Sequence, residues 1–323
     1  MFCCKIKKNV GGHVMANIIA VVWDFDKTLV DGYMQDPIFK HYGVNASDFW
    51  KEVNALPEKY MKEQNVLVNK DTIYLNQFIN YAKSGKFKGL TNKRLEEFGA
   101  DLKFYDGIPD IFEKTKKLIE DNPIYQEYDI KVEHYIVSTG MSQIIRGSSV
   151  MPYVEHIWGC ELIEGKDDQG EVCISEIGYT IDNTSKTRAL FEINKGVNSK
   201  DGREGVEVNT KIPEELRRVH FINMIYVADG PSDIPAFSLL NKNNGATFAI
   251  YPKGNMKAMK QVEKLRVEGR INMYAEADYT EGTTAYMWIC NKITEFAERI
   301  RKEEKAKFAK YAASEGPKHL IDE

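Results

Sequence analysis

Apolar and polar positions divide the chain into segments of two different periods. Residues 18–23 form a short apolar run, rich in β-branched residues, that ends in acidic residues. This is the pattern of a parallel strand that is buried on both faces. Residues 130–137, 221–227 and 246–251 have a similar character. Helical patterns lie between these runs, so we expect an α/β fold with a parallel, doubly wound sheet.

The segment of residues 33–103 interrupts this alternation. Aromatic residues, lysine and glutamate recur there at helical spacing, and we expect several helices and no strand. Ser47 is a candidate N-cap for one helix, and another helix is expected to begin at Thr91. Gly107 and Pro109 then open a helix that follows the insertion.

Three later segments complete the picture. Residues 161–179 hold a turn between two short extended runs, which predicts a hairpin. Residues 196–211 are rich in glycine, asparagine and lysine and are expected to form a surface loop. Residues 286–312 predict one long helix whose last part is charged on all sides and therefore solvated.

Length and charge narrow the classes of function. A chain of 323 residues can hold one large α/β domain or a core with a smaller domain. Its net charge of −4 argues against nucleic acid as a partner. Five cysteines without C-x-x-C spacing disfavour a disulfide framework or a zinc site, so a cytoplasmic location is expected. No apolar stretch is long enough to cross a membrane.

Polar side chains follow three of the expected strands. Ligands of open α/β sheets bind beyond the carboxyl ends of the strands, so we expect these side chains to share one edge of the sheet. They are Asp24 and Asp26, Ser138 and Thr139, and Asp229 and Asp233, while a helix start adds Lys186. Clustered carboxylates repel one another unless a cation compensates them. Magnesium suits a site with few carboxylates, several waters and a substrate phosphate.

The spacing of the first two acids also has a chemical reason. Residues i and i+2 of a strand share a face, so Asp24 and Asp26 can address one substrate. One can attack while the other handles a proton. Lys186 can shield the nucleophile from an incoming phosphate dianion, and Ser138 with the backbone amides around Gly140 can hold phosphate oxygens. Phosphoryl transfer depends mainly on positioning and charge neutralisation.

Four motifs, in this order, resemble those of the haloacid dehalogenase superfamily. An apolar strand followed by D-x-D-x-T lies at residues 21–29, and a strand ending in serine or threonine lies at residues 136–140. A lysine at a helix start lies at residues 185–187, and D-G-x-x-D after a strand lies at residues 227–233. The helical insertion resembles the cap of the phosphoserine-phosphatase-like branch.

The resemblance implies a role for each motif residue. Asp24 would form an aspartyl-phosphate, and Asp26 would protonate the leaving group and then activate water. Mg2+ would be bound by the carboxylates of Asp24 and Asp229 and by the backbone carbonyl of Asp26, with Asp233 close by. The substrate phosphate would be held by Ser138, Thr139, Gly140 and Lys186. An acid at the position of Asp26 favours phosphate chemistry over dehalogenation.

The resemblance also implies a domain plan and a function. It assigns residues 16–32 and 104–300 to a Rossmann-like core, residues 33–103 to a helical cap of the C1 type, residues 1–15 to an N-terminal extension, and residues 301–323 to a charged helix and tail. The expected function is a magnesium-dependent phosphatase for a small phosphorylated metabolite. Phosphotransfer to an acceptor other than water and a non-catalytic phosphate-binding or scaffold role are the alternatives. The sequence leaves the oligomeric state open.

Several of these residues also have simpler structural explanations. Asp233 can be the cap of the helix that follows it. Arg146 can reach a substrate anion, but a solvent-facing salt bridge is the preferred interpretation. Four residues of the insertion can line a pocket, although aromatic residues at helical spacing more often pack in a core: Tyr33, Met34, Phe39 and Trp50.

Overall fold

The computed structural model describes residues 17–197, 199 and 205–314, so the expected N-terminal extension lies outside the described residues. A seven-stranded sheet with the order β4-β3-β2-β1-β5-β6-β7 forms its centre. Every neighbouring pair is parallel except β3 and β4, which confirms the predicted α/β sheet. The strands are β1 (Asn17–Trp23), β2 (Ile130–Met141), β3 (His156–Lys166), β4 (Val172–Tyr179), β5 (Met224–Ala228), β6 (Ala246–Tyr251) and β7 (Met273–Glu276).

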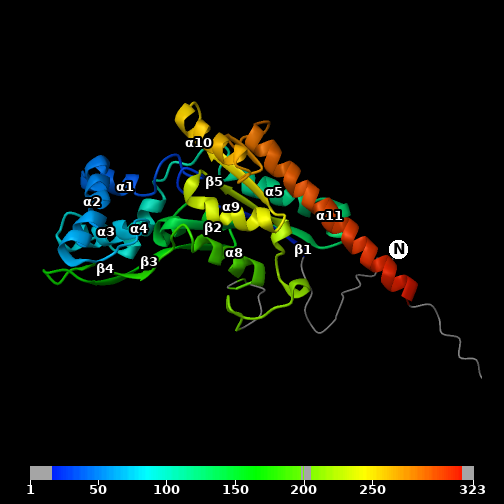
Figure 1. The fold of residues 1–323 in the computed structure, drawn as a ribbon, viewed down its shortest axis with the longest axis horizontal. Coiled ribbons are helices and arrows are strands. Elements are labelled where there is room, and N and C mark those ends of the chain that lie inside the picture. Colours follow the sequence, from blue (N-terminus) through cyan, green and yellow to red (C-terminus); the bar gives the residue numbers. More distant parts are fainter. Residues whose placement is uncertain (1–16, 198, 200–204, 315–323) are drawn as a thin grey trace, which may run out of the picture.

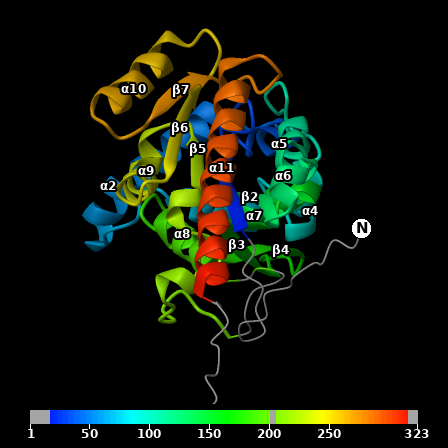
Figure 2. The same ribbon diagram turned by 90° about the vertical axis from the view of Figure 1, so that its right-hand side faces the viewer.

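Helices cover both faces of the sheet, as Figures 1 and 2 show. On one face lie α5 (Asp110–Glu120) and the long α11 (Thr284–Ser314), and on the other lie α8 (Lys186–Lys195), α9 (Ile234–Lys242) and α10 (Met256–Val267). Two short helices, α6 (Pro123–Gln126) and α7 (Ser142–Arg146), precede and follow β2. None of the helices in the described ranges combines the length and apolarity needed to cross a bilayer.

The central strand β1 shows why the sheet needs both layers. Side chains of a strand alternate between its two faces. Accordingly, Ile19, Val21 and Trp23 join the core beneath α5 and α11, whereas Ile18, Ala20 and Val22 join the core beneath α8, α9 and α10. All six are buried, because an all-apolar strand is stable only when both of its faces are covered.

The helical insertion lies between β1 and α5. It consists of α1 (Asp36–Tyr42), α2 (Ala46–Gln64), α3 (Ile73–Lys83) and α4 (Asn92–Gly99), as the sequence predicts. Figure 1 shows it at one end of the molecule, beside the β3–β4 hairpin. Its last helix, α4, packs closely on α7: a Cβ atom added to Gly147 would lie 1.7 Å from the backbone oxygen of Glu96. Glycine at that position is therefore what lets the insertion contact the core.

Some predicted boundaries are wrong, and the reasons are local. The cap of α2 is Asn45 rather than Ser47, since the Asn45 side chain accepts a hydrogen bond from the Asp48 N–H. Thr91 does cap α4, as predicted. The third expected strand begins at Met224, because the three residues before it form a 3-10 turn. Ser138, Thr139 and Gly140, expected at the end of the strand, belong to β2, which continues to Met141 past a break in register between Val137 and Met141.

The edges of the sheet differ more from the prediction. The hairpin expected at residues 161–179 is present, and Glu161 pairs with Tyr179. However, its first strand begins at His156 and also pairs with β2, so the hairpin belongs to the main sheet. The edge strand β7 is not predicted, because its four residues are too few to show a pattern. Helix α11 continues unbroken past residue 300, where we expected the core to end.

Candidate active site

Three adjacent strands, β2, β1 and β5, bring the predicted motifs to one edge of the sheet. Asp24 directly follows β1, Asp229 directly follows β5, and Ser138 lies in the last part of β2. The backbone N–H of Asp24 donates to the carbonyl of Val227, which ties the ends of β1 and β5 together at 2.9 Å. Motifs that are far apart in the chain are therefore close together in space, as expected for parallel strands.

Lys186 lies at the centre of this edge. Its Nζ is 2.7 Å from Asp24 Oδ1 and 2.6 Å from Asp233 Oδ1, and its side chain is 1% exposed. The lysine is the first residue of α8, and the preceding turn is fixed by Asp182, whose carboxylate accepts the N–H of Ser185 at 2.7 Å. Burial disfavours the ammonium, but the carboxylates of Asp233 and Asp24 raise the pKa of Lys186 above its ordinary value.

Asp233 does not act as the helix cap that we considered. Its carboxylate makes no capping hydrogen bond to α9. Instead, Oδ1 also accepts the Tyr226 hydroxyl at 2.6 Å, and Oδ2 accepts the Ser232 hydroxyl at 2.8 Å. The side chain is fully buried. Asp233 therefore provides Lys186 with a second, firmly held carboxylate partner besides Asp24.

The acidic cluster carries more negative charge than its lysine compensates. Carboxylate oxygens of Asp24, Asp229 and Asp233 lie within 4.8 Å of one another. Burial, opposed for Asp24 by Lys186, raises the pKa of Asp24 to about 6, and burial with the Asp24 charge raises the pKa of Asp229 to about 7. One ammonium therefore faces three carboxylates, and a divalent cation with oxygen ligands would compensate the remaining charge. The donor set fits magnesium.

Both oxygens of Asp24 are held in place. Oδ1 accepts Lys186 Nζ, and Oδ2 accepts the Thr28 hydroxyl at 3.2 Å. Between Asp24 and Thr28 in the chain, Lys27 adopts a left-handed conformation with φ of 56°, and its N–H donates to the carbonyl of Gly32. This tight turn brings the threonine of the motif back onto the carboxylate that precedes it.

Asp26 faces the helical insertion. Its Oδ1 accepts the backbone N–H of Met34 at 2.8 Å. Burial, followed by the charge of Asp24, raises the pKa of Asp26 to about 8. The Tyr74 hydroxyl is near enough to be affected: burial, then Cys160, then Asp26 raise the pKa of Tyr74 well above its ordinary value. Burial and the neighbouring charge therefore favour the protonated form of Asp26 in this arrangement.

The second motif packs against the same insertion. Ser138 Oγ accepts the N–H of Gly140 at 3.0 Å, and the N–H of Met141 points at the sulfur of Met34 at 3.1 Å. A Cβ atom on Gly140 would lie 2.1 Å from the Met34 methyl group. Thr139 contributes its backbone carbonyl, which accepts the Tyr74 hydroxyl at 2.8 Å. All eight predicted site residues thus belong to one connected region.

Comparison with known proteins places the chain in a family. No family model matches it. An uncharacterised protein of Borreliella burgdorferi is 38% identical over 290 residues, which cover 86% of this chain and 97% of that protein. The two proteins belong to one family. The four motifs, which resemble those of the haloacid dehalogenase superfamily, occur in fixed order and meet at one edge of the sheet.

Solved structures of the superfamily show a remote likeness. A haloacid dehalogenase family hydrolase from Salmonella enterica serovar Typhi is 14% identical, with 80% of this chain and 67% of that chain covered and a TM-score of 0.47. A phosphoserine phosphatase, as a phospho-aspartyl intermediate analogue, is 16% identical, with 80% and 93% covered and a TM-score of 0.45. At these values no substrate can be transferred to this chain.

Other residues singled out by the sequence take structural roles. Arg146 forms a two-pronged salt bridge with Glu161, at 2.5 and 3.0 Å, as we preferred from the sequence. Cys160 and Cys173 are buried thiols. Sequence reasoning missed Tyr226, which lies within β5 and shows no polar signal beyond its hydroxyl. It also left Thr28 without a role, although the motif pattern includes that threonine.

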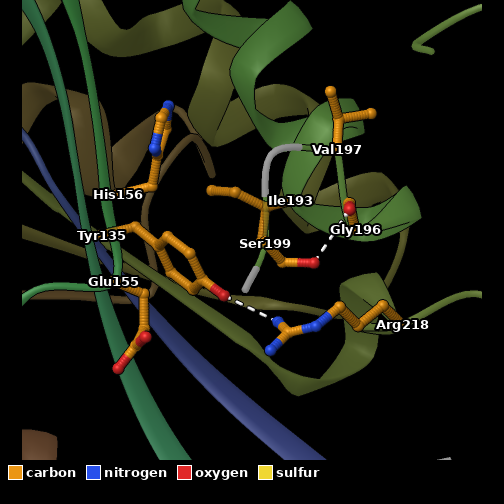
Figure 3. Close-up of a pocket in the computed structure, with 8 residues that line it drawn as sticks. All are labelled: Tyr135, Glu155, His156, Ile193, Gly196, Val197, Ser199 and Arg218. Atoms are coloured by element: carbon orange, nitrogen blue, oxygen red, sulfur yellow. Dashed lines mark hydrogen bonds between the residues drawn. The ribbon is translucent and has the colours of Figure 1, made fainter. Parts of the chain in front are cut away.

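A small cavity lies away from this edge, near the start of β3. It measures about 10 Å³ and is shown in Figure 3. Arg218 donates to the Tyr135 hydroxyl and pairs with both oxygens of Glu133, so the main polar groups beside the cavity are engaged. The volume is near that of one water probe, which excludes a substrate there.

Proposed function

We propose that this protein is a magnesium-dependent phosphatase that hydrolyses a small phosphorylated metabolite through an aspartyl-phosphate on Asp24. One observation carries the proposal. The Asp24 carboxylate is buried, bonded to Lys186 and Thr28, and surrounded by further carboxylates at the ligand-binding edge of an α/β sheet. A nucleophile with a fixed position and a nearby cation is what phosphoryl transfer needs.

The proposed reaction has two steps. An oxygen of Asp24 attacks phosphorus, the bond from phosphorus to the ester oxygen breaks, and Asp26 gives its proton to the departing oxygen. In the second step Asp26 takes a proton from water as the water oxygen attacks phosphorus. The bond to Asp24 then breaks, and inorganic phosphate leaves. The pKa of Asp26, raised to about 8, suits a group that must first donate a proton.

Charge neutralisation supports both steps. Lys186 lies against Asp24 and would contact a phosphoryl oxygen as negative charge moves onto it. The N–H of Gly140 now donates to the Ser138 hydroxyl. With substrate bound, both groups would donate to phosphoryl oxygens instead. Magnesium, held by Asp24, Asp229 and Asp233 with the Asp26 carbonyl, would supply the remaining positive charge. Its usual role in such sites is to polarise the phosphoryl group.

The test is phosphate release from a generic aryl phosphate by purified protein with magnesium. We expect activity that chelator removes, and loss of activity in Asp24→Asn. Asp168→Asn, in the exposed turn of the β3–β4 hairpin, is the matched control and should retain full activity. Turnover that survives Asp24→Asn, or that ignores chelator, would contradict the proposal. Turnover that requires an added alcohol would indicate phosphotransfer instead of hydrolysis.

A further inference from the structure

Three aromatic side chains of the insertion form a continuous wall beside the motifs. Tyr33 precedes α1, Trp50 lies in α2 and Tyr74 lies in α3. The ring centroids of Tyr33 and Trp50 are 6.0 Å apart, and those of Trp50 and Tyr74 are 5.8 Å apart. We call these three rings the aromatic wall. Packing with Phe39 explains part of the position of Trp50, and Tyr74 is 5% exposed, but Tyr33 is 39% exposed.

Both ends of the aromatic wall are attached to catalytic motifs. At one end the Tyr74 hydroxyl donates to the carbonyl of Thr139. At the other end the ammonium of Lys27 lies 4.1 Å from the centre of the Tyr33 ring. A cation at that distance is attracted by the quadrupole of the ring, and this attraction stabilises the position of the ring. The wall therefore spans from the first motif to the second motif.

The aromatic wall also lies on the side of the phosphorus from which the leaving group would depart. Asp26 is the proposed proton donor to the leaving group, so the leaving group must lie on the Asp26 side of the phosphorus. The backbone of Met34, next to Tyr33, bonds to the Asp26 carboxylate, and the Tyr74 hydroxyl bonds to the carbonyl of Thr139 in the second motif. Whatever leaves with the proton of Asp26 thus departs next to Tyr33 and Tyr74.

We propose that the aromatic wall selects phosphate esters whose leaving group is flat and unsaturated, and that it binds this group by ring stacking. The proposal rests on the proposed phosphatase function and names its substrate class. Offset or edge-to-face ring pairs are stabilising beyond the area that they bury. Lys27, held over Tyr33, would repel a leaving group that carries a net positive charge, so a cationic leaving group is disfavoured.

The test compares benzyl phosphate with cyclohexylmethyl phosphate. Both release a primary alcohol of similar size, but only the benzyl ring is flat. We expect kcat/KM to be about five-fold higher for benzyl phosphate, the size of effect typical of one ring pair. Tyr33→Leu should bring the two values close together by lowering that of benzyl phosphate alone. Because Tyr33 is 39% exposed, this variant should fold.

Controls separate this proposal from the function on which it rests. Tyr179→Leu, on β4 and 38% exposed, should keep the preference for benzyl phosphate. Trp50→Phe should retain most of the preference and Trp50→Leu should lose it, which a purely structural role would not produce. Equal kcat/KM for the two esters in the unchanged protein would overturn the wall proposal. Absence of turnover for both esters and for an aryl phosphate would instead overturn the phosphatase proposal.

Discussion

His134 allows a quantitative test of how the core depends on pH. The imidazole is fully buried in β2 and lies between Trp23 and α5. The indole N–H of Trp23 can only donate, so His134 Nδ1, at 3.1 Å, must accept. The proton therefore sits on Nε2, which is 3.2 Å from the carbonyl of Phe112. A second proton on Nδ1 would face a donor, so this pocket holds the neutral ring.

The magnitude follows from the shift in pKa. Burial, followed by the charge of Lys116, lowers the pKa of His134 from 6.5 to about 3. Between these values the unfolded chain binds a proton that the folded chain does not, so stability falls as pH falls below 6.5. At pH 5 the difference from 6.5 is about 1.5 units, which corresponds to about 2 kcal/mol of unfolding free energy. The carboxylates of Asp24 and Asp26, with raised pKa values, act in the opposite direction over the same range.

The assay must therefore isolate His134 from the acids. We would measure urea unfolding of the unchanged protein and of His134→Gln, which does not titrate, at about pH 7.5 and about pH 5. The contribution of the acids is common to both and cancels in the difference. The advantage of the unchanged protein over the variant should shrink by about 2 kcal/mol at the lower pH. A difference that stays constant between the two pH values would refute the argument from the buried neutral ring.

Two further substitutions test the architecture of the site. Lys186→Met leaves the carboxylates of Asp24 and Asp233 buried without their counter-charge, and we expect it to lower the unfolding free energy by about 3–5 kcal/mol, measured by urea unfolding at neutral pH. Gly147→Ala places a Cβ atom 1.7 Å from the Glu96 carbonyl, so α4 must move away from α7. We expect a loss of about 1–3 kcal/mol and faster proteolysis of the insertion, and unchanged proteolysis would contradict the close packing.

The sequence predicts best where one physical rule decides the outcome. The apolar run of β1 can only be stable between two helix layers, so its burial on both faces is determined locally. Adjacency of the motifs follows from the parallel sheet, because strand ends meet at one edge. No such rule predicts β7, because its four residues are stabilised by pairing with β6 rather than by an apolar pattern of their own. The sequence also misplaces the cap of α2, since Asn45 and Ser47 are both competent caps and only tertiary packing selects one.

Side-chain partners are what the sequence cannot supply. The pattern of the fourth motif predicts that Asp233 is near the site, but not that Tyr226 and Ser232 hold its oxygens. Similarly, Met34 carries no chemical signal in the sequence, yet its backbone N–H bonds to Asp26 and its sulfur meets the N–H of Met141. The contacts of Met34 depend on how the insertion rests on the core, and the bond from Tyr226 to Asp233 depends on how the loop after β5 folds back onto that strand.

The turn that follows the first motif fixes the position of Tyr33, one residue of the aromatic wall. Between Asp26 and Met34 the chain makes a tight turn, in which Lys27 bonds to Gly32 and Met34 returns to Asp26. Tyr33 therefore has little freedom to move independently of Asp26. Carboxylates clustered around a buried lysine are costly for stability, and apolar residues of similar volume would often be as stable or more so. In the reaction that we propose, this cluster and the aromatic surface beside Asp26 both serve the departure of the leaving group, which gives a reason to keep an arrangement that stability alone does not favour.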